Sequence, residues 1–280
     1  MSGRATGAQW RSFTSIAGVT LTLLALGLAL FGGLIAPHDP FATRFPALRP
    51  PSAEHWLGTD DLGRDTLSAV LSGARASLLV GAATAGVAGL LGTAIGAVAG
   101  FYGGRVDDAL MRFTELVQIA PRFFLAVLVA AMFGPSLALL TLLLALTFWP
   151  MTARLVRAQV LTLRQREWVI AARALGIREG RILIRHVLPN VMSVIVVTAA
   201  LQVGTAILVE ASLSFLGLGD RSVVSWGYML NGAQPFLRIA WWMSVFPGAA
   251  LVLTVLGTNL LADALYAVWD PTRHGAPRIV

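Results

Sequence analysis

Long apolar segments alternate with short polar ones along the whole chain. Residues 16–36 and 76–101 contain no charged side chain, and each is long enough to cross a hydrocarbon core of about 30 Å as a helix. Residues 187–210 and 239–262 are similarly apolar. The pattern therefore predicts helical membrane spans in these four ranges, with a kink at Pro247 in the last of them.

The first apolar run could instead belong to a cleaved signal peptide. The apolar region of a signal peptide is about 7–15 residues long and ends at a small-residue cleavage site. The run at 16–36 is longer and ends at Pro37-His38-Asp39-Pro40. These features favour a retained helix.

A further uncharged stretch, residues 123–153, is too long for one ordinary span. Gly134-Pro135-Ser136 lies near its middle, where a proline and a turn would break a helix. We expect a hairpin of two helices at 113–133 and 136–157, with one long kinked helix as the alternative. Six spans in total would place both termini on the same side of the membrane.

Three glycines in the second run, Gly92, Gly96 and Gly100, repeat every four residues. This spacing places them on one helix face, where small residues let another backbone approach closely. We interpret the repeat as a packing face.

The composition agrees with a membrane protein. Of the 280 residues, 56% are hydrophobic and 12% are charged, whereas soluble domains carry about 25% charged residues. There is no cysteine, which excludes disulfides and thiolate metal sites, and the four histidines show no ligand spacing. We therefore predict neither a metal site nor a catalytic group.

The formal net charge of +7 would suit nucleic acid, but the apolar runs argue against that partner. All 21 basic residues are arginine, and the absence of lysine excludes a P-loop, whose lysine reaches the nucleotide phosphates. ATP and Mg²⁺ would have to be bound by a partner. If the chain crosses the membrane six times, fifteen of the arginines lie in segments on the same side of the membrane as the N-terminus. The positive-inside rule then predicts cytoplasmic termini.

Acidic residues before the second span, Asp60, Asp61 and Asp65, suggest a calcium loop, but no bidentate glutamate follows at the required position. An Asp or Thr ahead of an apolar run is typical of a helix N-cap. We interpret these residues as the capped start of a helix.

Polar side chains within the spans are costly and are therefore candidates for function. Glu210 and Asp263 lie near span ends, and packing or interface roles suit them best. Gln202 and Asn259 are deeper. The candidates for a translocation path are Gln202, Glu210 and Asn259.

An arginine-rich segment, residues 164–190, connects the fourth and fifth spans. Three apolar residues share one helical face: Trp168, Ala172 and Leu175. Gly176 stands where a helix C-cap belongs, a short apolar segment follows at 182–184, and Pro189 closes it before the next span. The pattern predicts a helix, a glycine turn and a second helix. A basic amphipathic loop lying on anionic lipid is the alternative.

Within this segment, Ala171-Ala172, Gly176, Ile184 and Leu188-Pro189 resemble the "EAA" loop of ABC-importer permeases. In that family the short helix sits in a groove of the ATP-binding subunit and transmits its opening and closing. The resemblance implies these ATPase-coupling residues: Glu167, Ala171, Ala172, Arg173, Gly176, Ile184, Leu188 and Pro189. Ile170 replaces the glutamate that names the motif, and Glu167, one turn earlier, could take over part of its charge role.

Other segments resemble the dipeptide/oligopeptide/nickel permeases more narrowly: residues 55–68, Gly73-Ala74-Arg75, residues 210–219 and Trp226-Gly227. The resemblance implies a bacterial inner-membrane permease subunit that is not an enzyme and works by alternating access. Its implied partners are a second permease in a heterodimer, two ATP-binding subunits and an extracytoplasmic substrate-binding protein. The implied cargo is peptides, related small solutes or nickel chelates.

We therefore expect an all-α membrane protein of about six transmembrane helices. It would comprise an N-terminal part at 1–75, a five-helix core at 76–270 with a coupling loop at 160–190, and a tail at 271–280. A secondary transporter is the main rival, but it would need mid-membrane carboxylates and broken inverted repeats. A structural or receptor-type membrane subunit is the second rival.

Overall fold

The computed structural model describes residues 3–269, within which no β-strand occurs. The helices follow one another in this order: α1 (Gly3–Ile35), α2 (Thr66–Tyr102), α3 (Gly104–Ile119), α4 (Arg122–Phe133), α5 (Leu137–Leu163), α6 (Glu167–Ala174), α7 (Glu179–Ile182), α8 (Leu188–Leu213), α9 (Trp226–Ala233) and α10 (Trp242–Trp269). The tail expected at 271–280 lies outside the described residues. Two π-helical turns, η1 (Leu183–Val187) and η2 (Ser214–Leu218), adjoin α8, and a 3₁₀ turn, η3 (Gln234–Phe236), follows α9.

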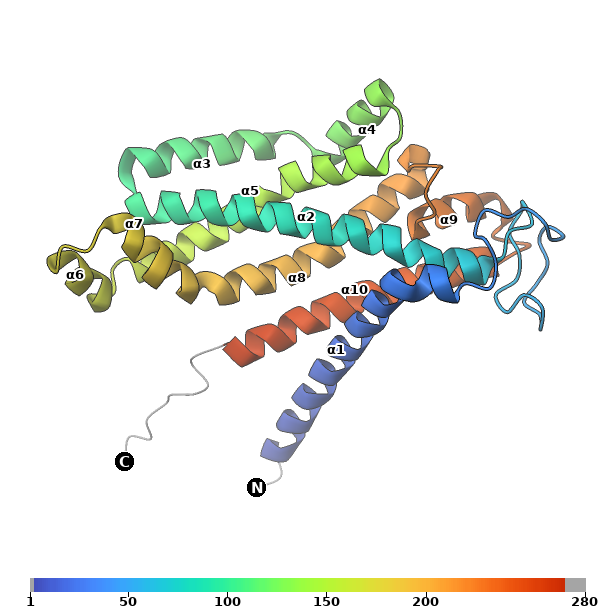
Figure 1. The fold of residues 1–280 in the computed structure, drawn as a ribbon, viewed down its shortest axis with the longest axis horizontal. Helices are drawn as coiled ribbons and strands as arrows, with labels where there is room; N and C mark the ends of the chain where they lie inside the picture. The colour runs from blue at the N-terminus through green and yellow to red at the C-terminus, as the bar shows by residue number, and fades with distance from the viewer. Residues whose placement is uncertain (1–2, 270–280) are drawn as a thin grey trace.

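The long helices form an elongated bundle in which the chain direction alternates (Figure 1). Helix α2 lies at its centre and packs against α1, α5 and α8, while α10 packs against α1 and α8. The α6–α7 segment lies at one end of the bundle, and α9 lies at the other with the non-helical segment 36–65 (Figure 1). These are called the α6 end and the α9 end below.

Five helical segments have the length and composition of membrane spans: Phe13–Ile35, Thr66–Tyr102, Leu137–Leu163, Glu179–Leu218 and Trp242–Val268. Helices α3 and α4 pass the same test only as a pair, and they make a sixth if the bent pair is counted as one broken span. The expected all-α architecture of about six spans is confirmed.

Helix α2 begins ten residues before the uncharged run at 76–101, because Asp65 caps it. The Asp65 carboxylate accepts the Ser68 backbone N–H at 2.9 Å, so the helix starts at Thr66 and includes Arg75. The interpretation of this acidic segment as a capped helix start is confirmed.

The hairpin expected around Gly134 is present, and the single kinked helix is not. Gly134 ends α4 with a φ of 81°, and the Ser136 side chain caps α5. The continuous helix expected at 113–133 is wrong, because the α3–α4 pair is bent by 67°. Pro121 lacks an N–H and disfavours helical geometry at Ala120, whose ψ is 123°.

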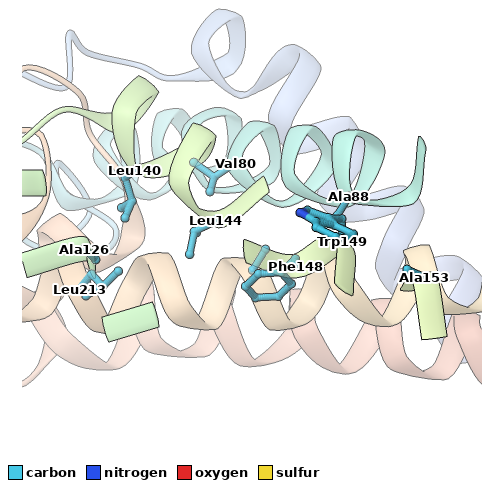
Figure 2. Close-up of a cluster of buried hydrophobic side chains, with 10 residues drawn as sticks. Val80, Ala88, Ala126, Leu140, Leu144, Phe148, Trp149, Ala153 and Leu213 are labelled. Atoms are coloured by element: carbon cyan, nitrogen blue, oxygen red, sulfur yellow. The ribbon is translucent and has the colours of Figure 1, made fainter. Parts of the chain in front are cut away.

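The glycines of α2 bring its backbone against α5. A Cβ atom at Gly96 would lie 2.3 Å from the Ala153 carbonyl oxygen, and one at Gly92 would lie 2.7 Å from that of Trp149. The predicted packing face is therefore confirmed. A buried apolar cluster between these helices and α8 includes Val80, Leu144 and Phe148 (Figure 2).

Candidate functional site at the α6 end

The segment between α5 and α8 folds as a short helix, a glycine turn and a second short helix. Helix α6 closes with two backbone hydrogen bonds, from Gly176 N–H to the Arg173 carbonyl and from Ile177 N–H to the Ala172 carbonyl. Gly176 has a φ of 74°, a left-handed conformation that side chains with a Cβ disfavour. The predicted pattern is confirmed.

Four apolar side chains anchor this segment to the bundle. These side chains are Val169, Ile182, Leu183 and Val187. They are buried in one core cluster with Ala97 and Phe101 of α2 and with Val156 and Val160 of α5. Because interiors are close-packed, a displacement of α6 would be passed to α2, α5 and α8. The segment is thus fixed to the ends of three spans.

The face of α6 that is buried in the structure differs from the face that the sequence pattern predicted. Val169 is fully buried and Ala172 is partly buried, but Trp168 is 40% exposed and Leu175 is 80% exposed. Helix α6 has only eight residues, and Leu175 lies at its C-cap, where the chain turns away from the helix. With Ile170 and Ile184, 56% and 68% exposed, these side chains leave apolar surface at the tip of the bundle. Such surface is typical of an interaction site.

An ion pair spans the glycine turn. The Arg173 guanidinium donates to both carboxylate oxygens of Glu179, at 2.9 and 3.2 Å, and lies 5.4 Å from the centre of the Phe101 ring. Both partners are partly exposed, so the pair contributes at most about 1 kcal/mol to stability. Arg173 therefore braces the turn, whereas Glu167 lies exposed in the first turn of α6.

Two more arginines hold the base of the segment. Arg157 of α5 forms a bidentate pair with the buried Asp107 of α3, and Arg164 donates to the Gly100 carbonyl at the end of α2 at 3.1 Å. Sequence spacing gave no signal for these contacts, since the partners lie 50 and 64 residues apart.

The remaining coupling candidates also lie at this end. Ala171 is exposed, Leu188 is partly buried and Pro189 is exposed at the start of α8. Pro189 does not end the helix, because the chain runs on from α7 through η1 into α8. The break expected there is wrong: the π-helical turn η1 directly precedes Pro189, and such turns occur as single-turn insertions within continuous helices.

The translocation-path candidates differ in their surroundings. Gln202 is buried and donates to Thr152 at 2.8 Å, and Glu210 is buried with hydrogen bonds from Ser214 and Ser225 at 2.7 and 2.9 Å. These two residues join α8 to α5 and to the start of α9. Asn259 is exposed on α10.

Helix α10 presents Asn259 and, one turn later, Asp263 on a face with exposed apolar side chains. The neighbouring helix α8 exposes Thr205 and Ser212. Polar groups at the surface of membrane spans usually meet other protein or water rather than lipid.

Comparison with known proteins shows which protein family this chain belongs to. Residues 92–274 match the binding-protein-dependent transport system inner membrane component family. The chain belongs to this family of permeases. The matched range begins within α2 and contains the whole α6–α8 segment.

Several transport permeases are similar in sequence to this one over most of its length. It is 39% identical over 260 residues to a dipeptide transport system permease protein of Alkalihalophilus pseudofirmus, covering 92% of this chain and 85% of that one. It is 37% identical to a probable D,D-dipeptide transport system permease protein of Escherichia coli, covering 93% and 88%. It is 38% identical to a glutathione transport system permease protein of Pectobacterium atrosepticum, covering 94% and 89%.

The permease is therefore a multi-pass inner-membrane component of an ABC importer, and it is not an enzyme. This finding overturns the secondary transporter as the rival interpretation. It also explains why a chain without lysine can take part in ATP-driven transport: in this family, ATP and Mg²⁺ act through partner ATPases.

Proposed function

We propose that this permease is the transmembrane subunit of an importer for peptides or related small solutes, and that its 167–190 segment docks a separate ATPase. The observation that supports the docking role is the exposed tip of this segment. The tip carries Ala171 and Gly176, two residues of the stretch that resembles the EAA loop, and its buried base packs against α2, α5 and α8. A small side chain at Ala171 permits close approach of a partner, and the apolar groups around it supply contact area.

Coupling follows from the rigidity of the base. ATP-driven closure of the ATPase would displace α6, and the buried side chains beneath it would carry the displacement into the spans. A packed interface of this kind switches between discrete arrangements rather than deforming gradually. Alternating access is the transport mechanism that we infer.

We place the α6 end in the cytoplasm, and with it both termini. The arginine excess of the segments at this end supports the orientation. The α9 end would then face outward, where a substrate-binding protein can dock. Reaction of a thiol in α6 with a membrane-impermeant reagent in intact cells would contradict the orientation.

The exposed polar face of α8 and α10 supports a second permease as partner. Asn259 and Thr205 would meet that subunit, or the water-filled path between the two, rather than acyl chains. A heterodimer with two ATP-binding subunits, which bind ATP and Mg²⁺, completes the proposed assembly. Gln202 and Glu210 would support this face from inside the chain.

Peptide cargo is proposed because the similar permeases are named for dipeptide and glutathione transport. The test is uptake of a labelled dipeptide by cells that make the complete transporter, compared with cells lacking only this chain. We expect uptake to depend on this chain and to be inhibited by excess unlabelled dipeptide. Uptake of a nickel chelate but not of peptide would contradict peptide as the cargo, and uptake that is independent of this chain would contradict the importer role.

A further inference from the structure

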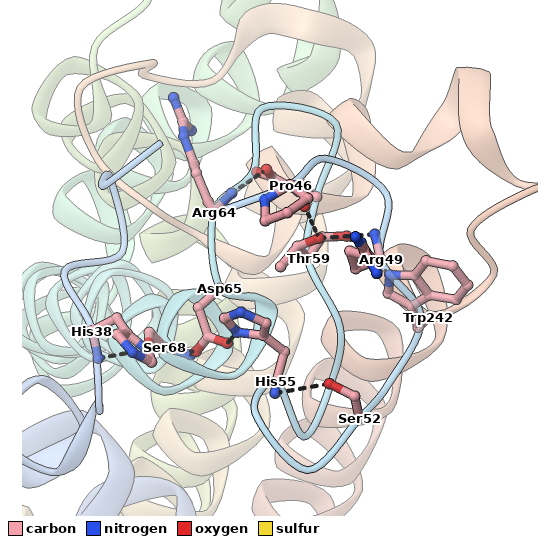
Figure 3. Close-up of polar contacts among 11 residues, drawn as sticks. His38, Pro46, Arg49, Ser52, His55, Thr59, Arg64, Asp65, Ser68 and Trp242 are labelled. Atoms are coloured by element: carbon pink, nitrogen blue, oxygen red, sulfur yellow. Dashed lines mark hydrogen bonds and ion pairs between the residues drawn. The ribbon is translucent and has the colours of Figure 1, made fainter. Parts of the chain in front are cut away.

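Two histidines and an aspartate converge at the α9 end, and the proposed transport mechanism assigns none of the three a role (Figure 3). His38 follows α1, His55 lies in the middle of the 36–65 segment, and Asp65 caps α2. One ligand atom from each residue lies within 4.8 Å of the other two. No spacing in the sequence indicated this cluster, because the two histidines are 17 positions apart without regular structure between them.

The Asp65 carboxylate is the centre of the cluster. Its Oδ1 lies 3.0 Å from Nδ1 of His55, and its Oδ2 lies 3.8 Å from Nδ1 of His38. The Ser68 hydroxyl and backbone N–H both donate to Oδ2, at 2.6 and 2.9 Å. Burial raises the pKa of Asp65, but the hydrogen bonds from Ser68 and His55 outweigh burial and hold it below its usual range. The hydrogen bonds from Ser68 and the contact with His55 fix the orientation of the carboxylate.

His38 supplies the observation that points to a ligand. Its Nδ1 is shielded from solvent but has no hydrogen-bond partner, although the residue as a whole is only partly buried. Leaving a buried polar atom unsatisfied costs about 1–3 kcal/mol. Phe45 packs against both imidazoles, with ring centres 4.8 and 4.4 Å away, and holds the two rings beside the carboxylate.

We propose that His38, His55 and Asp65 bind one divalent transition-metal ion of the Zn²⁺ class. Two imidazoles and a carboxylate suit such an ion, whereas Ca²⁺ and Mg²⁺ prefer oxygen ligands. In a tetrahedral zinc site two ligand atoms lie about 3.3 Å apart, so the observed separations need only small ring rotations to match. The serine hydrogen bonds to Asp65 would serve as the outer support that metal-binding carboxylates commonly have.

A cavity adjoins the cluster on the side of Asp65, and neither histidine lines it. Asp65 lines a cavity of about 250 Å³ between the 36–65 segment and α9, and Asp60 and Asp61 line it too. Arg64 and Arg221 share this cavity, so the acidic side chains exceed the basic ones by one. A bound ion would tie the first residues after α1 to the start of α2 and so stiffen the outward face.

The test uses the full-length chain in detergent, purified through a tag without histidine, stripped with EDTA and titrated with Zn²⁺ by calorimetry. We expect one equivalent to bind and Tm to rise, with no effect of Mg²⁺. His38→Ala should weaken binding at least about tenfold, because loss of even a supporting group near a metal costs about 10–100-fold. His38→Ala is the decisive variant, because the His38 side chain makes no hydrogen bond through Nδ1.

His186→Ala is the matched control, since His186 is exposed in η1, which directly follows α7 at the α6 end. It should bind zinc as the unaltered chain does. His55→Ala should also lose zinc, and a lower Tm without metal would report the lost hydrogen bond to Asp65 separately. Absence of binding, or equal zinc affinity in His38→Ala and the unaltered chain, would overturn the proposal and leave a purely structural hydrogen-bond cluster.

Discussion

Replacing Ala171 with tryptophan should abolish uptake and release the ATP-binding subunit while the permease itself stays folded. Ala171 is exposed on α6, so an indole there does not have to enter the buried core of the chain. In a close-packed interface, added volume typically costs about 1–3 kcal/mol, which corresponds to roughly 5–150-fold weaker binding. Co-purification of the ATP-binding subunit and uptake of labelled dipeptide are the two measurements.

The control for this change is Ala109→Trp, at an exposed alanine of α3. It should leave both measurements unchanged. The same pair of variants separates docking from attachment to lipid, because tryptophan favours the membrane interface and would strengthen a lipid contact. Normal uptake with Ala171→Trp would therefore favour the lipid-binding alternative.

Gly96→Leu should lower the thermal stability of the permease more than any other single change discussed. A Cβ at this position would lie 2.3 Å from the Ala153 carbonyl oxygen, which is backbone and cannot rotate away. The α2 and α5 helices would have to separate along their long contact. We expect a loss of at least about 3 kcal/mol, at the upper end of the usual cost of overpacking.

Gly86→Leu in the same helix is the matched control. Gly86 is exposed, and a Cβ there would meet nothing within 4 Å. Replacing a mid-helix glycine by a good helix former stabilises by about 0.5–1 kcal/mol, so Tm should hold or rise slightly. Thermal unfolding in detergent measures both variants, and equal Tm values for the two would contradict the packing role of Gly96.

The spans could be predicted from sequence because each depends on local properties of the chain. Uncharged runs mark helices that a bilayer can surround, and Gly134-Pro135-Ser136 marks a turn regardless of distant contacts. Gly176 is similar, since its left-handed conformation follows from its place after a short helix. Asp65 predicts the start of α2 for the same reason.

What the sequence did not reveal depends on contacts between distant segments. Val169, rather than the face with Trp168 and Leu175, is buried because of how α6 lies against α2 and α5. Gln202 was expected deep in a span, but its amide is committed to Thr152 of α5, which no periodicity shows. The sequence pattern did not predict the bend at Pro121, because the helix expected at 113–133 was extended past the start of the uncharged run at 123 to reach the length of a span.

The central claim is that α6 contacts an ATPase on the cytoplasmic side, and site-specific cross-linking tests it most directly. The chain has no cysteine, so Ala171→Cys introduces its only thiol, to which a photoreactive maleimide can be attached. We predict a light-dependent adduct between the permease and the ATP-binding subunit of the same transporter, and none from Ala109→Cys. No adduct from Ala171→Cys, or equal adducts from both positions, would contradict the account.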